Sequence, residues 1–129
     1  MTGKILRFLI AVSAAALASP AAFAQNDLDA LAAASEQVDS GMALARSQIA
    51  ASDLPGAVGT LERVLLAHPE IVPPRLLYAS LLCRLDDRRG ADIELGLLAD
   101  KEIADSDWAA VQAACPGVAR PAPPRRPRR

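Results

Sequence analysis

The chain has 129 residues, which is enough for one small domain and too few for two. Aromatic residues make up only 3% of it while alanine and aliphatic residues dominate, so packed helices are favoured over a sheet. The net charge of −1 hides an asymmetry, because residues 25–119 hold seven basic and fifteen acidic side chains (7 − 15 = −8) and five arginines follow.

The first 24 residues have the pattern of a secretory signal peptide. Two basic residues begin it, residues 8–18 are apolar, and residues 22–24 (AFA) form a small-x-small cleavage site. A membrane anchor is the alternative, but the apolar run is short and Pro20 interrupts it. We therefore expect cleavage after Ala24 and a periplasmic or secreted mature protein.

Helical periodicity begins with the mature chain. Residues 25–51 predict either one long helix or a lead-in helix (25–37) followed by the first helix of a hairpin, with Gly41 as the weakest point. Asp53 can cap the next helix, which runs from about Pro55 to Ala67. That helix ends because the following residue precedes a proline and is pushed out of helical geometry.

The second half of the chain predicts three more helices. The expected N-caps are Asp86 or Asp87 for the second of them and Ser106 for the third. Trp108 and Val111 of the third helix would cover the exposed end of the second hairpin, as terminal elements do in repeat stacks. The three helices are Val72 to about Leu85, about Arg88 to Asp100, and Asp107 to Ala114.

A spacing of 34 residues relates the two hairpins, since Ala57 falls on Ala91 and Leu61 on Leu95. This period is typical of helix–turn–helix repeats, which bury their apolar faces by stacking on copies of themselves. The residues expected to pack between the helices are Leu44, Ala45, Ala57, Leu61, Val64, Tyr78, Ala79, Ala91, Leu95 and Leu98.

These positions resemble the tetratricopeptide family. In that family a small residue closes the first helix against the second, as at Ala45, and another opens the second helix, as at Ala57. A large apolar residue follows one turn later, as at Leu61, and a proline ends the unit, as at Pro69. The resemblance implies an all-α, right-handed stack of helical hairpins. Its parts would be a first repeat (38–71), a second repeat (72–103) and a capping helix (104–116). The chain departs from the family pattern at Gly41, Gln48, Arg75 and Ile103.

By the same resemblance, one face of each repeat lines a concave groove that binds a segment of another protein. Methionine and leucine would supply adaptable apolar contact there, and arginines would take a carboxylate or an acidic segment. The alternative is that Met42 and Ile49 belong to the core and lie under the lead-in helix. The predicted groove residues are Met42, Arg46, Ile49, Leu76, Ser80 and Arg84, which follow one another three or four positions apart within each repeat.

Cys83 and Cys115 are the only two cysteines, and both lie in the part predicted to be exported. An oxidising compartment favours a bridge between them, which would hold the capping helix on the second repeat. Closing a loop of this length contributes about 3–4 kcal/mol in the chain-entropy model. The alternative is one buried and one exposed thiol, the latter free to pair between chains.

Residues 117–129 are too polar and too rich in proline to pack, so a disordered tail is expected there. Its positive charge could bind an anionic surface such as phospholipid head groups, with an affinity that salt reduces. A solvated segment without a role is the alternative. The basic residues of the tail are Arg120, Arg125, Arg126, Arg128 and Arg129.

No pattern in the chain indicates chemistry. Glycine-rich phosphate loops, nucleophile–base patterns and metal-ligand spacings are absent from the sequence. His68 fits a histidine at a helix C-terminus better than a ligand or an acid–base group. We therefore expect no catalytic residue, no metal and no cofactor.

The sequence favours a non-catalytic, exported adaptor that binds a protein segment in a concave helical groove, with a role in envelope assembly or secretion. The alternative is an envelope-tethering protein whose arginine tail binds an anionic surface. Nucleic acid is not expected as a partner because export separates the tail from it. The identity of the protein partner and the oligomeric state stay open.

Overall fold

The computed structural model describes residues 27–30, 32–33 and 36–125. Within these ranges all regular structure is helical and no strand occurs, which confirms the predicted all-α class. No helix in this part of the chain has both the length and the apolarity needed to cross a membrane. The predicted signal peptide and residues 126–129 lie outside the described residues. The helices are α2 (Val38–Ala50), α3 (Leu54–Ala67), α4 (Val72–Arg84), α5 (Arg88–Gly96) and α6 (Asp105–Ala114).

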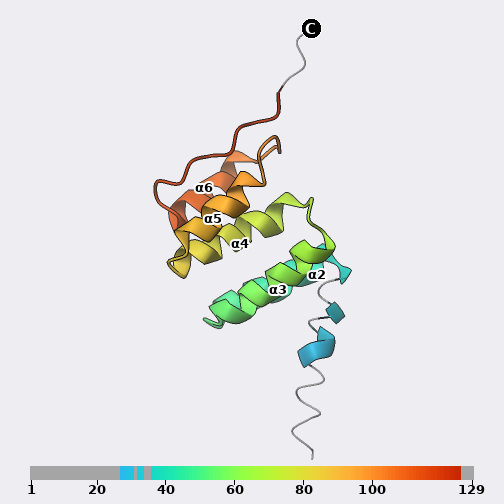
Figure 1. The fold of residues 1–129 in the computed structure, drawn as a ribbon. Helices are drawn as coiled ribbons and strands as arrows, with labels where there is room; N and C mark the ends of the chain where they lie inside the picture. Colours follow the sequence, from blue (N-terminus) through green and yellow to red (C-terminus); the bar gives the residue numbers. More distant parts are fainter. Residues whose placement is uncertain (1–26, 31, 34–35, 126–129) are drawn as a thin grey trace, which may run out of the picture.

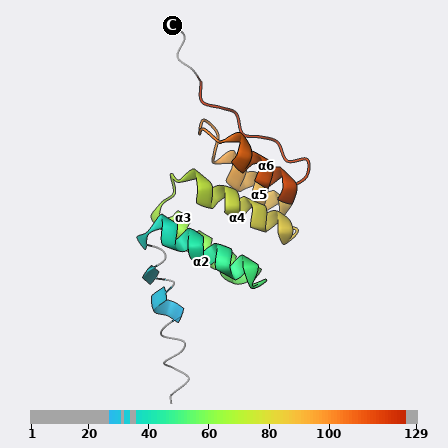
Figure 2. The same ribbon diagram turned by 180° about the vertical axis from the view of Figure 1, so that it is seen from behind.

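Short loops join these helices into two hairpins, followed by α6 (Figure 1). Within the hairpins α2 packs against α3 and α4 against α5, while α3 packs on α4 between them. α4 also contacts α6 and is therefore the central element. The helices α2, α4 and α6 lie on one side of the molecule, towards the viewer in Figure 2.

The lead-in segment and α2 are separate helices in the described residues. Residues 27–30, 32–33 and 36 are helical and exposed, and Gln37 then adopts an extended backbone (φ −133°, ψ 124°) as the N-cap of α2. The weak point predicted at Gly41 is wrong, because Gly41 is buried within α2 and its N–H donates to Gln37 O at 3.1 Å. The break occurs where the backbone leaves helical geometry, at the cap.

The second helix of each hairpin starts with the same side-chain cap. Asp53 Oδ1 accepts a hydrogen bond from Gly56 N–H at 2.9 Å, and Asp87 Oδ1 accepts one from Gly90 N–H at 2.8 Å. These bonds satisfy backbone donors that have no partner inside a helix. The cap predicted at Asp53 is confirmed, and of the two candidates before α5 the structure selects Asp87.

The turns before these caps also share one backbone conformation. Ser52 and Asp86, 34 positions apart, have φ values of 63° and 62°. In both turns the N–H of the capping aspartate donates to a carbonyl of the preceding helix, at 2.8 Å and 2.9 Å. The repeat read in the sequence is therefore present in the backbone as well.

The predicted packing residues that the spacing of 34 pairs have similar burial in the two hairpins. Ala57 and Ala91 are both fully buried (0% exposed), and Leu61 and Leu95 are 0% and 2% exposed. Leu44 and Tyr78 are half-buried, and the other eight predicted packing residues are buried. Two apolar clusters result, one joining the first hairpin to α4 and one joining the second hairpin to α6.

The helix predicted to reach Asp100 ends earlier, because α5 stops at Gly96. Residues 97–100 form turns, and these keep Leu98 buried at 2% exposure. Asp100 has a φ of 66°, and its N–H donates to Ala122 O at 3.0 Å. The N–H of Asp100 therefore donates to the tail, whereas in a longer α5 it would donate to a carbonyl of the helix.

The start of α6 also differs from the prediction. The helix begins at Asp105, and its N-cap is Ala104, which offers no side-chain acceptor. Ser106 lies inside the first turn and is not the cap. Asp105 and Asp107 place negative charge at this end, where the helix dipole favours it.

Two of the departures from the family pattern have a structural reason. Gln48 Oε1 accepts a hydrogen bond from Thr60 Oγ1 at 2.8 Å, which joins α2 to α3. Arg75 of α4 is 8% exposed and forms an ion pair with Glu94 of α5. Its second guanidinium nitrogen donates to Pro69 O at 2.8 Å, in the loop between the hairpins. A polar link between two helices is therefore present at both positions.

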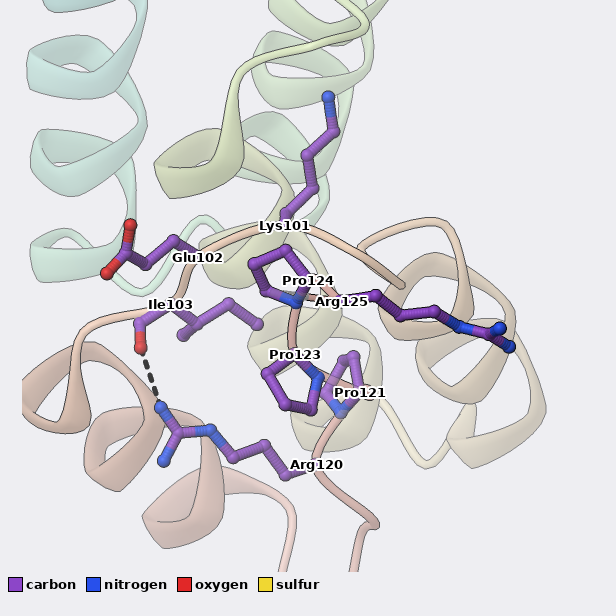
Figure 3. A pocket seen from close by; sticks show the side chains of 8 residues that line it. All are labelled: Lys101, Glu102, Ile103, Arg120, Pro121, Pro123, Pro124 and Arg125. Carbon is purple, nitrogen blue, oxygen red and sulfur yellow. Dashed lines mark hydrogen bonds between the residues drawn. The ribbon is translucent and has the colours of Figure 1, made fainter. Parts of the chain in front are cut away.

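Residues 117–125 lie along α6 and the loop before it (Figures 1 and 3), although the sequence predicts a disordered tail from residue 117. Val118 packs on the apolar cluster of the second hairpin. Arg120 donates to Ile103 O at 2.6 Å and to Asp105 Oδ1 at 2.7 Å. Val118 and Arg120 therefore contact the helical part of the protein, which the sequence did not predict for this segment.

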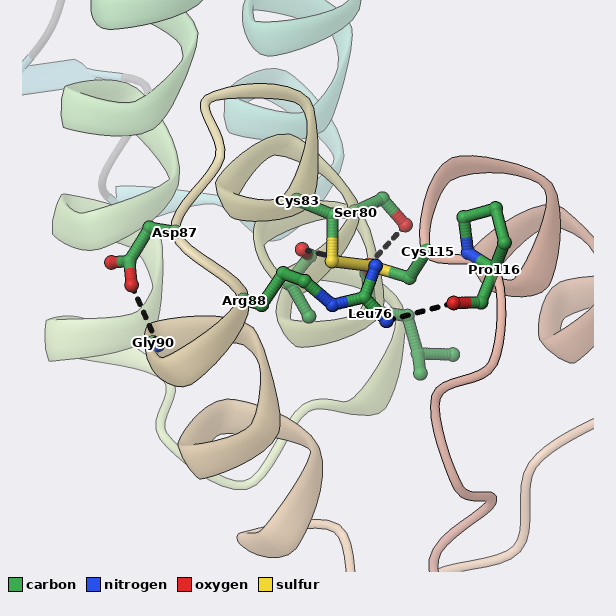
Figure 4. Close-up of a disulfide and its surroundings, with 9 residues drawn as sticks. Leu76, Ser80, Cys83, Asp87, Arg88, Gly90, Cys115 and Pro116 are labelled. Carbon is green, nitrogen blue, oxygen red and sulfur yellow. Dashed lines mark hydrogen bonds between the residues drawn. A yellow bond between two sulfur atoms is a disulfide. The ribbon is translucent and has the colours of Figure 1, made fainter.

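Cys83 and Cys115 form a disulfide, as the sequence predicts for an oxidising compartment (Figure 4). Their Cα atoms are 5.5 Å apart, and the bond joins the last turn of α4 to the end of α6. Beside it, Arg88 donates to Pro116 O at 2.7 Å. The disulfide holds α6 against the second hairpin.

Candidate functional site

A pocket of about 150 Å³ opens between α2, α4 and α6. These are the first helices of the two hairpins and the helix that follows them. Buried apolar side chains form its floor, and charged side chains stand at its edges. The lining residues are Met42 and Arg46 from α2, Pro73, Leu76, Leu77 and Ser80 from α4, and Asp107, Ala110 and Val111 from α6.

Four of the six predicted groove residues meet in this pocket: Met42, Arg46, Leu76 and Ser80. Ile49 and Arg84 do not line it. Ile49 packs, half-buried, on the cluster of the first hairpin, and Arg84 is exposed near the end of α4.

Met42 and Leu76 have two roles at once. They are 6% and 4% exposed and belong to the two apolar clusters, so Met42 is a core residue as the alternative interpretation has it. Both also reach the pocket surface. The described residues of the lead-in segment are exposed, with Leu28 at 57%. The floor of the pocket is therefore part of the core.

Arg46 and Asp107 are the charged groups of the pocket, and both are exposed. Within the described part of the chain neither side chain forms a salt bridge or a hydrogen bond to another residue. Arg75 and Arg120, in contrast, are held by carboxylates and carbonyls of the protein. The charges at the pocket are thus available to a bound molecule.

The sequence prediction missed the contribution of α6. Asp107, Ala110 and Val111 follow one another at helical spacing, so one face of α6 faces the pocket. Of these three residues the sequence prediction gives a packing role only to Val111, as part of the face that covers the second hairpin. Contact between α4 and α6 brings these residues beside Leu76.

A second, larger pocket of about 640 Å³ lies between the tail and the loop before α6 (Figure 3). Arg120 and Arg125 line it together with three prolines of the tail. The guanidinium of Arg120 donates hydrogen bonds to Asp105 and to Ile103 O. Its carbon lies 6.0 Å from the centre of the Trp108 ring. Of the predicted basic tail, one arginine therefore has an internal role, Arg125 is exposed, and Arg126, Arg128 and Arg129 lie outside the described residues.

Among the described residues no group of three or more His, Cys, Asp or Glu side chains is placed to hold a metal ion. His68 is the C-cap of α3, and its N–H donates to Val64 O at 2.8 Å. Its Nε2 is buried and has no hydrogen-bond partner in the described part of the chain. This placement agrees with the helix-end position predicted for it.

Tyr78 lies where the two apolar clusters meet. Burial raises the pKa of its phenol, and the hydrogen bond from its hydroxyl to Glu62 Oε1, 2.8 Å long, raises the pKa further. The phenol therefore stays protonated and acts as a donor between α4 and α3.

No protein-family model, no curated protein and no solved structure matches this chain. The tetratricopeptide resemblance thus rests on the residue pattern, and a function has to be argued from the geometry of the pocket.

Proposed function

We propose that this protein is a non-catalytic, exported adaptor that binds a segment of another protein in the groove formed by α2, α4 and α6. The observation that carries the proposal is the pocket itself. It has an apolar floor held by the core, and its charged residues have no internal partner in the described structure.

The finer fold in this proposal is a right-handed, tetratricopeptide-like stack of two hairpins with a capping helix. Equal burial of Ala57 and Ala91 supports it, as do the matched caps at Asp53 and Asp87. In such a stack, successive first helices lie side by side and leave a concave surface for a partner.

A protein segment fits the pocket better than a small-molecule substrate does. Its volume of about 150 Å³ is below the roughly 300–1,000 Å³ of common small-molecule sites. It also lies on a surface made by three helices, and an extended or helical segment can use such a surface along its length.

Export is supported by two features. The first residues have the signal-peptide pattern, and the disulfide between Cys83 and Cys115 is of the kind that persists in oxidising compartments. The protein would therefore work in the periplasm or outside the cell, and its partner would be an envelope or secreted protein.

The test places a photo-crosslinking amino acid at Ala110, which is exposed and lines the pocket. The matched control is Ala109, which is exposed but does not line it. We expect a crosslinked protein partner from Ala110 and none from Ala109. Replacing Arg46 and Arg84 with glutamate should abolish the crosslink, whereas the same change at Arg63 and Arg89 should leave it.

Removing residues 123–129 distinguishes the groove proposal from the alternative in which the basic tail tethers the protein to an anionic surface. This deletion preserves the contacts of Arg120. Under our proposal the crosslink from Ala110 survives this deletion. If partner association disappears with the deletion and is unaffected by the glutamate replacements, the tail is the binding element and the groove proposal is wrong.

A further inference from the structure

We propose that the pocket selects a segment with one apolar anchor side chain between an acidic group and a basic group. The acidic group would face Arg46 and the basic group would face Asp107. This inference rests on the proposed function and states which chemistry the partner must carry.

The volume of the pocket limits the anchor to one side chain. The volume of this pocket, about 150 Å³, is that of a cavity that accepts one benzene ring. Met42, Leu76 and Val111 supply an apolar floor, and a methionine thioether adapts to anchors of different shape. A leucine, methionine or phenylalanine therefore fits, and two such side chains do not.

The two charges stand at opposite ends of the pocket. Asp107 also lines a third pocket, together with Pro73 and Glu102. This places Asp107 at the N-terminal end of α4. Arg46 lies one turn after Met42, towards the C-terminal end of α2, and Arg84 extends the basic end one turn beyond Ser80 on α4. The groove thus runs from an acidic end to a basic end.

The polar groups between these ends do not offset the charges. Ser80 Oγ donates to Leu76 O at 2.8 Å, so its only proton is used within α4 (Figure 4). Arg46 and Asp107 form no salt bridge with each other or with any other described residue. A bound segment that carries both charges therefore complements the groove at each end, while a segment with one kind of charge is repelled at one end.

Three synthetic peptides of equal length test the inference, each with a central leucine. One carries lysines on one side and glutamates on the other, one carries only glutamates, and one carries only lysines. Because a peptide can bind in either direction, the bipolar peptide can always place its glutamates at Arg46. We expect it to bind the oxidised protein about tenfold more tightly than either other peptide at moderate salt.

Single charge reversals should change the ranking in a predictable way. Arg46→Glu leaves the pocket lined by an acidic side chain at each end and should favour the all-lysine peptide, whereas Asp107→Lys should favour the all-glutamate peptide. Combining Arg46→Glu with Asp107→Lys should restore the preference for the bipolar peptide. Ala110→Phe should block all three by filling the pocket, and Ala109→Phe is the matched control that should not.

Equal affinity for the three peptides, or an unchanged ranking in Asp107→Lys, would overturn the inference. If either result is found while a partner still crosslinks from Ala110, the groove binds a segment without selecting it by charge. Absence of binding by every peptide together with absence of the crosslink rejects both the inference and the proposed function.

Discussion

Arg75 and Glu94 form an ion pair that joins α4 to α5 across the second hairpin, with side chains only 10% and 20% exposed. Arg75 also donates to Pro69 O, so one guanidinium connects the second hairpin to the loop that follows the first. Arg75 is thus the centre of a local polar network.

Replacing Arg75 with leucine should destabilise the protein by about 1.5–3 kcal/mol, because the half-buried carboxylate of Glu94 loses its charged hydrogen-bond partner. The double replacement Arg75→Leu and Glu94→Leu should recover most of this loss, since an apolar pair can take the place of a buried ion pair. Urea unfolding of the three proteins measures both effects. A double variant as unstable as the single one would show that the hydrogen bond to Pro69 O is the dominant contribution.

Gly56 and Gly59 both lie in α3 and should respond oppositely to alanine. A Cβ on Gly56 would lie 2.0 Å from Asp53 Oδ2, so Gly56→Ala should displace the cap and cost about 1 kcal/mol. Gly59 has nothing within 4 Å of such a Cβ, so Gly59→Ala should stabilise the helix by up to about 1 kcal/mol. Thermal unfolding distinguishes the two, and equal shifts would contradict the role of the cap.

Reducing the disulfide between Cys83 and Cys115 should cost about 3–4 kcal/mol. Denaturant unfolding with and without a reductant measures the loss, and the free thiols can be counted in parallel. The Cys83→Ala and Cys115→Ala double variant is the control, because its stability should not respond to reductant. A midpoint unaffected by reductant in the unaltered protein would contradict a stabilising bridge.

Replacing Arg120 with alanine should release the segment that follows it. The change removes the hydrogen bonds to Ile103 O and Asp105, at a cost of about 1 kcal/mol for these partly exposed groups. The amide of Asp100 donates to Ala122 O, so its hydrogen exchange should become faster. Arg125→Ala is the matched control, and equal exchange at Asp100 in both variants would contradict the role given to Arg120.

The stability should fall at high pH through Tyr78. Its pKa is raised in the folded state by burial and by the hydrogen bond to Glu62, so the folded protein holds this proton more tightly than the unfolded chain does. The contribution is complete below the unfolded pKa of about 10 and decreases as the pH rises above it. Tyr78 is the only tyrosine, so phenolate absorbance reports on it alone. The Tyr78→Phe variant should lose this part of the pH dependence of unfolding. Ionisation of Tyr78 in the folded protein at the pKa of a free tyrosine, about 10, would contradict the prediction.

Much of the fold can be predicted from the sequence because it depends on short-range relations. Each second helix is started by an aspartate three positions before a glycine, and the bonds that Asp53 and Asp87 accept span only that distance. The spacing of 34 residues likewise predicted equal burial of Ala57 and Ala91, since both occupy the same place in a hairpin. The disulfide was predictable from the presence of just two cysteines in the sequence, together with the export that the signal-peptide pattern predicts.

Contacts between distant residues decided the rest. The end of α5 and the path of the tail depend on the bond from Asp100 to Ala122 and on the acceptors that Arg120 finds, and no local pattern encodes these. The same holds for the pocket. Arg46 was predicted as a groove residue from its position on α2, but Asp107 became its counterpart only when α6 packed against α4. Helical periodicity determines which side chains share a face, whereas the packing of whole helices determines which faces meet.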